Sequence, residues 1–539
     1  MEAWDILVIG DGPAALRSAA QSAKHGAKTL LISSSALGSG DKSALDGLAA
    51  PIQEMNNRGH REDTIKSGYF LCDQDIVASK TSRAIDEMNH LEKAGVVFSR
   101  DSKGLPSTHK GIGHNSPRLV DAGDASIRDI QQVLEEQCMK YGVVRRSDQL
   151  PVMLVETNQK VDGLVTLDMI NGQFVAIQTK AVIIADGGFE GLFQGTGIGF
   201  GIDLALQAGM PLRGMEFIAK TPLGVANTKL SISSSILGYG ASLCNASGDI
   251  FSADSMAELC ETVLETGPAV LDGRDMGDNK VWWNSVFRTV KSATGVDMEK
   301  FTVGLENRVE QTIGGIPTDE HGRAVVGSWS RWFTGLYAAG DSACSGLNGA
   351  GTLPGNRLLD SLSGGNNAGT HAAEWVKSQP FANTENLVLA LQRCIDNHHI
   401  TGDEESAETV RRIGSIDSTL LDVATKFTSS PNSAEELSNY LEELSKATEL
   451  AQSIHLDQTS LIANTNFVAR TRIQAGIRLL TCSIRASMAR NESRGVHNRA
   501  DFKDENPELI HHITVDNEGN IGTLAVRKGQ KDNWVLAPQ

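Results

Sequence analysis

The segment WDILVIGDGPAALRSAAQSAKHGAKTLLISSS near the start of the chain places a glycine-rich turn between two apolar runs. DILVIG predicts a buried strand, ALRSAAQSAKHG predicts a helix, and KTLLIS predicts a second buried strand. In such a unit the turn brings the backbone close to a pyrophosphate, which binds at the N-terminus of the helix. The segment therefore predicts a Rossmann-like dinucleotide-binding unit within an α/β fold.

The turn itself reads Gly-x-Gly-x-x-Ala. Gly10 makes the tight turn, Gly12 leaves space for the pyrophosphate, and Ala15 replaces the third glycine where helix and strand pack. The second strand ends in Ser33 instead of the acidic residue that usually contacts a ribose, although a serine hydroxyl can form a similar hydrogen bond. A glycine-rich turn of this kind can also simply connect a strand to a helix without binding a ligand. Whether it binds a dinucleotide, and which one, must therefore be judged from the rest of the sequence.

Two further segments favour FAD over NAD. TKAVIIADGGFEG is a β-branched strand that runs through Ala185 into Gly187, and GLYAAGDSACSGLNGAGTLPGNRLLD is a strand followed by Gly340, Asp341 and a long glycine-rich turn into a helix. A ligand held by three segments so far apart in the sequence is large and bound in an extended conformation. FAD fits that description better than NAD.

Composition excludes several other classes of protein. The 539 residues carry a formal net charge of −17 without a basic run, which argues against nucleic acid or an anionic membrane surface as a partner. Seven scattered cysteines without a C-x-x-C pair argue against disulfides, zinc or an iron–sulfur cluster and for a reducing compartment. No apolar run approaches the ~20 residues of a transmembrane helix, so we expect a cytoplasmic protein without a transmembrane segment.

The sequence also contains two histidine pairs, His398-His399 and His511-His512. Neither pair has a carboxylate or cysteine at the spacing of metal ligands, so we expect surface histidines and no metal site.

Five phrases resemble the flavoprotein subunits of succinate dehydrogenase and fumarate reductase, a family that includes L-aspartate oxidase and, more remotely, adenylylsulfate reductase. They are GGIPTDEHGRAVVGSWSRWFTGLYAAGDSAC, EDTIKSGYFLCDQDIV, GVVFSRDSKGLP, AGMPLRGMEFI and NESRGVHNRADF. The resemblance covers nearly the whole chain in the family's order. A strand that ends in serine, as at Ser33, also occurs in complex II flavoproteins.

The resemblance implies a domain organisation. Residues 1–215 and 313–375 would form the FAD-binding domain, 216–312 an inserted α+β capping domain, 376–500 a C-terminal helical domain, and 501–539 a tail. The segment SAEELSNYLEELSKATELAQSIHLDQ supports the helical domain because its apolar residues recur at helical spacing. HHITVDNEGNIGTLAVRK in the tail predicts a hairpin with its turn at DNEGN.

The resemblance also implies which residues contact FAD. Asp341 would accept a hydrogen bond from a ribityl hydroxyl, in place of the family's glutamate. The candidate cofactor residues are Gly10, Gly12, Pro13, Ala14 and Ala15 along the pyrophosphate, Ser33 and Ser34 near the adenosine ribose, Ala185, Gly187, Gly340 and Asp341 in the two later turns, and Asn356 and Leu358 beside the flavin ring.

The family's covalent link to the flavin does not carry over. Complex II flavoproteins attach FAD through a histidine in a phrase like S-H-T-x-x-A-Q-G-G-I, and the matching stretch here is SALDGLAAPI, with Ala44 at the histidine position. The resemblance therefore implies non-covalent FAD, as in aspartate oxidase.

The family's dicarboxylate-binding cations are also replaced. Two histidines and an arginine of the family correspond here to Thr221, Glu310 and Thr352. Burying a dicarboxylate without cations costs several kcal/mol per charge, so we expect a substrate other than a C4 dicarboxylate. Arg357 and His497 remain as candidate proton donors, and together with Thr221 and Thr352 they are the candidate catalytic residues.

Three functions remain open at this point. The first is an FAD-dependent oxidoreductase that transfers hydride at flavin N5 and acts on a substrate other than a C4 dicarboxylate. The second is a genuine succinate dehydrogenase or fumarate reductase subunit with a rebuilt site. The third is a non-catalytic flavin-binding subunit for electron transfer or assembly. Electrons leaving the flavin go to a second substrate, to oxygen or to a partner. The resemblance leaves open an iron–sulfur or other electron-transfer subunit, through which the protein would be peripheral to a membrane.

Overall fold

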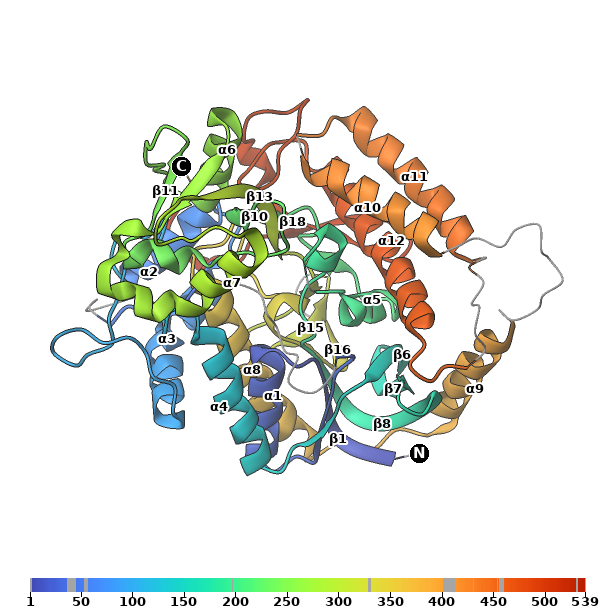
Figure 1. The fold of residues 1–539 in the computed structure, drawn as a ribbon. Coiled ribbons are helices and arrows are strands. Elements are labelled where there is room, and N and C mark those ends of the chain that lie inside the picture. The colour runs from blue at the N-terminus through green and yellow to red at the C-terminus, as the bar shows by residue number, and fades with distance from the viewer. Residues whose placement is uncertain are drawn as a thin grey trace.

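A computed structural model describes most of the chain (Figure 1). The described residues are 2–35, 45–52, 57–195, 197–327, 331–400, 413–429, 431–452, 454, 460–529 and 532–538.

A parallel sheet forms the centre of the fold. Its strand order is β5–β2–β1–β8–β16, with β1 (Glu2–Ile9) between β2 (Thr29–Ile32) and β8 (Gln173–Ile184). β5 (Val144–Arg146) extends the sheet beyond β2, and β16 (Arg331–Ala338) pairs with the end of β8. Because these strands are parallel, their carboxyl ends meet at one edge, which is where doubly wound sheets bind ligands. All the glycine-rich turns predicted from the sequence follow strands that end at this edge.

The two faces of the sheet are covered by different helices. Ile6 and Val8 of β1 pack with the helices of one layer, and Leu7 and Ile9 pack with those of the other, as expected for a strand buried on both sides. The first layer holds α1 (Pro13–Lys24), α3 (Gln74–Ala94), α4 (Ser126–Lys140) and α8 (Asn356–Val376), and the second holds α5 (Phe200–Gln207) and the C-terminal helices (Figure 1). This arrangement confirms the predicted α/β fold class.

An antiparallel extension adjoins the central sheet. β6 (Gln149–Thr157) and β7 (Lys160–Asp168) pair with each other, and β7 pairs with the first half of β8. α9 (Glu385–Ile400) covers this extension, because Leu387 packs against it with its neighbours on the helix. The helix that begins the predicted helical domain therefore packs on the sheet of the FAD-binding region. β15 (Arg323–Val326) pairs antiparallel with β16, and α2 (Arg58–Ser67), β3 (Leu48–Ala49) and β4 (Leu119–Val120) complete this region.

The inserted segment folds around its own core. Four antiparallel strands have the order β10–β13–β12–β11, and Leu223, Leu243, Leu271 and Leu305 pack together with buried Trp283 beneath them. The elements of this cap are β10 (Ile218–Val225), β11 (Ser242–Asn245), β12 (Ala269–Asp272), β13 (Val303–Thr312), α6 (Met256–Thr266) and α7 (Asn284–Thr294), with the 3-10 helices η2 (Ser234–Tyr239) and η3 (Arg274–Trp283).

Three long helices, α10 (Ile413–Ser429), α11 (Ala434–Gln452) and α12 (Thr465–Ala489), pack together beside the sheet (Figure 1). None of the helices described here is both long and apolar enough to cross a bilayer.

A hairpin of β18 (His511–Val515) and β19 (Ile521–Ala525) follows, and β18 also pairs with β9 (Leu212–Arg213). The expectation that His512 is a surface residue is wrong. Its side chain is buried and lies 3.0 Å from Asp73, because β18 is the middle strand of this small sheet.

Candidate cofactor and substrate site

A cavity of about 340 Å³ lies at the carboxyl edge of the parallel sheet. Segments from four strand ends line it, although they are far apart in the sequence. Among the residues predicted to contact FAD, the structure places these around the cavity: Gly10, Gly12, Pro13, Ala14, Ser33, Ser34, Ala185, Gly187, Gly340 and Asp341.

The N-terminus of α1 opens into this cavity. Gly12 is the residue before the helix, with φ −80°, and Pro13 is its first residue. No side chain caps this end and its first turn holds no acidic residue, so its backbone N–H groups are available to an anion. At Gly187, where φ is +87°, a Cβ atom would meet no atom within 4 Å and would occupy the cavity itself. These features fit the pyrophosphate of FAD.

Gly10 has a different role from Gly12. A Cβ atom at Gly10 would lie 2.2 Å from the Ala185 carbonyl oxygen, and φ is +130°. Gly10 is therefore required for the close approach of the loops after β1 and β8, whereas Gly12 has an ordinary backbone conformation.

Three of the predicted cofactor residues do not line this cavity. Ala15 is fully buried between α1 and the sheet. The Asn356 amide lies 2.8 Å from His60 Nε2 and donates to Thr64 Oγ1 at 2.9 Å. Leu358 lines a second, adjacent cavity.

Two acidic residues in the wall of the cofactor cavity were not anticipated from the sequence. Asp186 accepts hydrogen bonds from the Gly201 N–H and the Ser342 hydroxyl, and burial raises its pKa to about 6. Glu190 accepts hydrogen bonds from Thr312, and burial raises its pKa to about 7. Both residues could have been predicted from the segment IIADGGFEG, in which two acidic residues follow the end of a buried strand.

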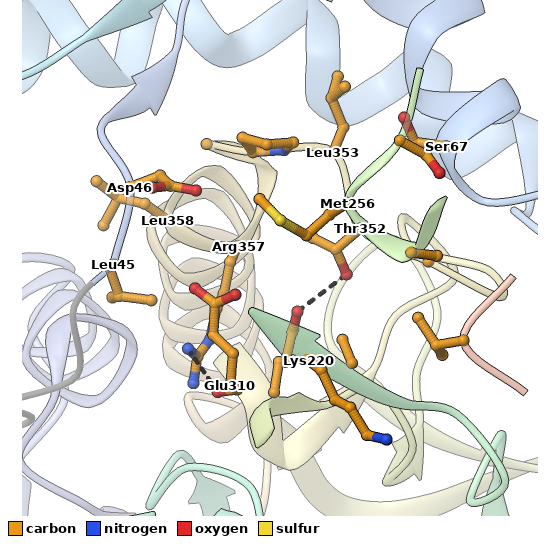
Figure 2. Close-up of a pocket in the computed structure, with 18 residues that line it drawn as sticks. Leu45, Asp46, Ser67, Lys220, Met256, Glu310, Thr352, Leu353, Arg357 and Leu358 are labelled. Carbon is orange, nitrogen blue, oxygen red and sulfur yellow. Dashed lines mark hydrogen bonds between the residues drawn. The ribbon is translucent and has the colours of Figure 1, made fainter. Parts of the chain in front are cut away.

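The second cavity, of about 40 Å³, lies between the cofactor cavity and the cap. Figure 2 shows its labelled residues, which come from the loop before β3, from the end of α2, from β10, α6 and β13 of the cap, and from α8 and the loop before it. Leu45 and Arg357 line both cavities. A molecule in the second cavity would therefore lie next to one bound in the first.

A chain of hydrogen bonds crosses this boundary. The Thr352 hydroxyl donates to Gln311 Oε1 at 2.9 Å, and Gln311 Nε2 donates to Asp341 Oδ1 at 2.8 Å. Arg357 Nε donates to Asp341 Oδ2 at 2.7 Å. Thr352 and Arg357, predicted as catalytic candidates, are thus brought together through Gln311 and Asp341.

Arg357 is held by acidic groups of the protein itself. Its Nη2 lies 2.6 Å from Asp341 Oδ2 and 3.5 Å from Glu190 Oε1, and its Nη1 donates to the Glu310 carbonyl at 3.1 Å. Only about 10% of its side chain is exposed. Asp341, expected to bind the ribityl chain, is therefore also the main partner of Arg357.

Two carboxyl groups face each other across the second cavity. Asp46 Oδ1 accepts hydrogen bonds from the hydroxyls of Ser233 and Ser234, both at 2.8 Å, and from the Ser235 N–H at 3.2 Å. Burial raises the pKa of Asp46 against these donors. Burial and the Asp46 charge raise the pKa of Glu310 to about 8. Lys220 points away from this pair, and its Nζ donates to the Thr428 carbonyl (Figure 2).

Thr221 and His497, the other two catalytic candidates, do not line the second cavity. The Thr221 hydroxyl is buried and accepts a hydrogen bond from the Leu223 N–H. The His497 ring lies 3.3 Å from the Arg490 carbonyl, and burial next to Arg490 lowers its pKa to about 3. His497 is therefore neutral at pH 7 and faces a separate cleft beside α10. Ala44, the position that corresponds to the flavin-linking histidine, lies outside the described residues.

Within the described residues, no three or more His, Cys, Asp or Glu side chains come together as metal ligands. All seven cysteines are buried as free thiols.

The fold and the two cavities define an FAD-binding α/β flavoprotein, and comparisons with known proteins extend this result. Residues 5–291 and 302–358 match the family model described as FAD binding domain, and residues 420–534 match the model described as fumarate reductase flavoprotein C-term. The chain is 27% identical to a succinate dehydrogenase flavoprotein subunit of Rickettsia bellii over 96% of this chain and 94% of that protein. It is 30% identical to L-aspartate oxidase of Streptomyces coelicolor over 67% of each chain.

Solved structures show the same fold. A structure of the E. coli quinol fumarate reductase flavoprotein superimposes with a TM-score of 0.90 at 23% identity, covering 100% of this chain and 99% of that chain. Adenylylsulfate reductase from Archaeoglobus fulgidus superimposes with a TM-score of 0.75 at 15% identity, covering 99% and 97% of the two chains. The chain belongs to the FAD-binding flavoprotein family of succinate dehydrogenase, fumarate reductase and L-aspartate oxidase, and it is an FAD-dependent oxidoreductase.

Proposed function

We propose that this FAD-dependent oxidoreductase acts on a neutral or cationic substrate instead of a C4 dicarboxylate. The observation that supports this is the charge around the second cavity. Four carboxyl groups surround it or its border with the cofactor cavity, and Arg357, the guanidinium among them, is already paired with Asp341. The four are Asp46, Glu190, Glu310 and Asp341.

Binding a dianion in this cavity would be electrostatically costly. Burial and neighbouring carboxyl groups raise the pKa of Glu190 to about 7 and of Glu310 to about 8, so this site disfavours negative charge. A dicarboxylate would bring two negative charges into it, and burying them without further cations costs several kcal/mol per charge. A neutral or cationic molecule meets no such penalty. The family's second histidine and its arginine correspond here to Glu310 and Thr352, which line the second cavity, so these substitutions remove positive charge where an anion would bind.

Different residues of the chain would bind the cofactor and orient the substrate. The N-terminus of α1 binds the pyrophosphate, and the turns at Gly187 and Gly340 contact the extended cofactor. FAD, when bound, accepts a hydride at its N5 atom. Thr352 and Arg357 line the second cavity at its boundary with the first, where they would orient a substrate and exclude water from the reacting bond.

A panel of six compounds tests the substrate class. FAD-loaded protein is mixed without oxygen with succinate, succinic acid monoamide, succinamide, 4-aminobutanoate or 1,4-diaminobutane, and the loss of oxidised-flavin absorbance is followed. Fumarate is tested separately with the reduced flavin. We expect bleaching by a neutral or cationic compound and a rate at least about 100-fold lower with succinate, because the carboxyl groups of the cavity repel a dianion.

Succinate oxidation is the second candidate function, favoured by the alignment of this chain with succinate dehydrogenase flavoprotein subunits over 96% of its length. Turnover of succinate or fumarate at ordinary enzymatic rates, on the order of 1 to 1000 per second, would replace our proposal with this one. No reaction with any compound would instead favour a subunit that only transfers electrons or assists assembly.

FAD is expected to be non-covalent. The position of the family's flavin-linking histidine holds Ala44, which offers no nucleophilic atom for a link to the flavin. The purified protein should be yellow and release one FAD per chain into the supernatant after acid or heat denaturation. Flavin absorbance that stays with the precipitated polypeptide would contradict this prediction.

We further propose that electrons leave the flavin to a partner subunit. Relatives of this chain are named flavoprotein subunits, and the seven scattered cysteines contain no C-x-x-C pair for a cluster of its own. An iron–sulfur or other electron-transfer subunit would accept the electrons and hold the protein peripherally at a membrane.

A further inference from the structure

Glu310 occupies an irregular position in the cap sheet. β13 pairs antiparallel with β10, and the register runs from Ala219 opposite Gln311 directly to Lys220 opposite Val309. Glu310 is therefore an extra residue on β13, which is a β-bulge. A bulge bends its strand and changes the direction in which a side chain points, and bulges are frequent beside active sites.

The bulge places both the backbone carbonyl and the side chain of Glu310 at the boundary between the two cavities. Its carbonyl accepts a hydrogen bond from Arg357 Nη1 at 3.1 Å. Its side chain lines the second cavity (Figure 2). In a regular strand this residue would have been paired with a residue of β10.

The Glu310 carboxyl group has no hydrogen bond or ion pair with any residue in the described part of the chain. Asp46, by contrast, is held by three donors from the cap. Of the two facing carboxyl groups, Glu310 is thus the one that can exchange a proton with a molecule in the cavity. The titratable or charged groups that act on it are Asp46 before β3, Glu190 in η1 (Glu190–Phe193), Asp341 in η4 (Gly340–Ser342), Arg357 in α8 and Cys260 in α6.

We propose that Glu310 is the acid–base residue of the reaction, an assignment that rests on the second cavity being the substrate site. In the oxidative direction, a substrate C–H bond breaks and its hydrogen leaves with both electrons to FAD. The neighbouring O–H, N–H or C–H bond of the substrate breaks in the same event. Its proton goes to a Glu310 carboxylate oxygen, and its electron pair forms the new double bond of the product. In the reductive direction the protonated Glu310 returns that proton.

The environment of Glu310 suits this role. A group works best as an acid or base when its pKa lies close to the working pH. Burial and the facing Asp46 charge raise the pKa of Glu310 to about 8, so it exchanges its proton close to neutral pH. Arg357 lowers the pKa of Glu310 and so opposes part of this shift, although it contacts only the Glu310 carbonyl and not its carboxyl group.

A spectral titration tests the assignment without a substrate. Wild type, Glu310→Gln, Glu310→Asp and the control Glu306→Gln are loaded with FAD, and the oxidised-flavin absorbance is followed from pH 5.5 to 9.5. Glu306 is on the same strand, but its side chain is 45% exposed. We expect a transition near pH 8 in wild type and in Glu306→Gln, a displaced one in Glu310→Asp, and none in Glu310→Gln. The same transition in Glu310→Gln overturns the proposal.

Flavin reduction then tests the chemical step. With any panel compound that bleaches the wild-type flavin, Glu310→Gln should slow reduction by about 100-fold or more at saturating compound, with partial recovery in Glu310→Asp. Reduction of Glu310→Gln within about threefold of wild type overturns the proposal. If no compound bleaches wild type, the proposed function fails, whereas the spectral titration still decides the role of Glu310.

Discussion

Replacing Gly12 with valine should give a folded protein that no longer retains FAD. The backbone at Gly12 has φ −80°, which valine adopts without strain, so the fold itself does not require glycine there. The valine side chain would instead enter the space in front of α1, where we expect the N–H groups of the helix to contact the pyrophosphate. We expect FAD content below about a tenth of wild type, measured as flavin released per polypeptide, with an unchanged circular dichroism spectrum.

Two further glycine variants show whether the effect is local. Gly304→Val, on the cap strand β13, is the control, because the nearest atom to a Cβ there is 3.8 Å away. It should retain its FAD. Gly10→Ala should destabilise the protein, because its Cβ would overlap the Ala185 carbonyl. Normal FAD content in Gly12→Val would contradict the proposed position of the pyrophosphate.

Replacing Arg357 with methionine should destabilise the folded protein, and more so at high pH. Arg357 and its partner Asp341 are about 10% and 12% exposed, and removing one member of a buried ion pair typically costs about 3–5 kcal/mol. Without the guanidinium, the pKa values of Glu190 and Glu310 rise further above those of the unfolded chain. The folded variant then binds more protons than the unfolded chain over a wider pH range. Its stability therefore falls more steeply as the pH rises.

The measurement is denaturant unfolding of the FAD-free proteins at pH 5.5 and pH 8.5. Arg357→Lys keeps the charge and should recover part of the loss. The control is Lys446→Met on α11, whose pair with Glu442 is about two-thirds exposed, and it should change nothing measurable. A loss of stability in Arg357→Met that is equal or smaller at pH 8.5 would contradict the electrostatic account.

The FAD-binding part of the molecule was largely predictable from the sequence. The strand–helix–strand unit around Gly10 and Gly12 forms as predicted, and the α/β fold class and the family are confirmed. Each of these features is visible in a few adjacent residues, either as a periodic pattern of apolar residues or as glycines at a turn. Parallel strands then bring their carboxyl ends to one edge, so turns distant in the sequence surround one cavity.

The substrate side could be predicted only in part. The loss of the family's histidines and arginine is visible by alignment, and it predicted a changed substrate class. The partners of the remaining residues were not visible. Arg357 pairs with Asp341 and Glu190 from two other segments, and His497 is buried beside Arg490, outside the second cavity.

The sequence by itself thus determined the chain's fold class, its cofactor and its family, because these depend on local periodicity and on motifs of a few residues. Only the tertiary structure decided which groups surround the second cavity and which carboxyl group faces it without a hydrogen-bond partner among the described residues. Glu310 is the clearest case, because its placement depends on a one-residue shift in the register between β10 and β13. A register shift changes which side chains share a face, and it arises from the packing of two strands more than eighty residues apart, which no local pattern records.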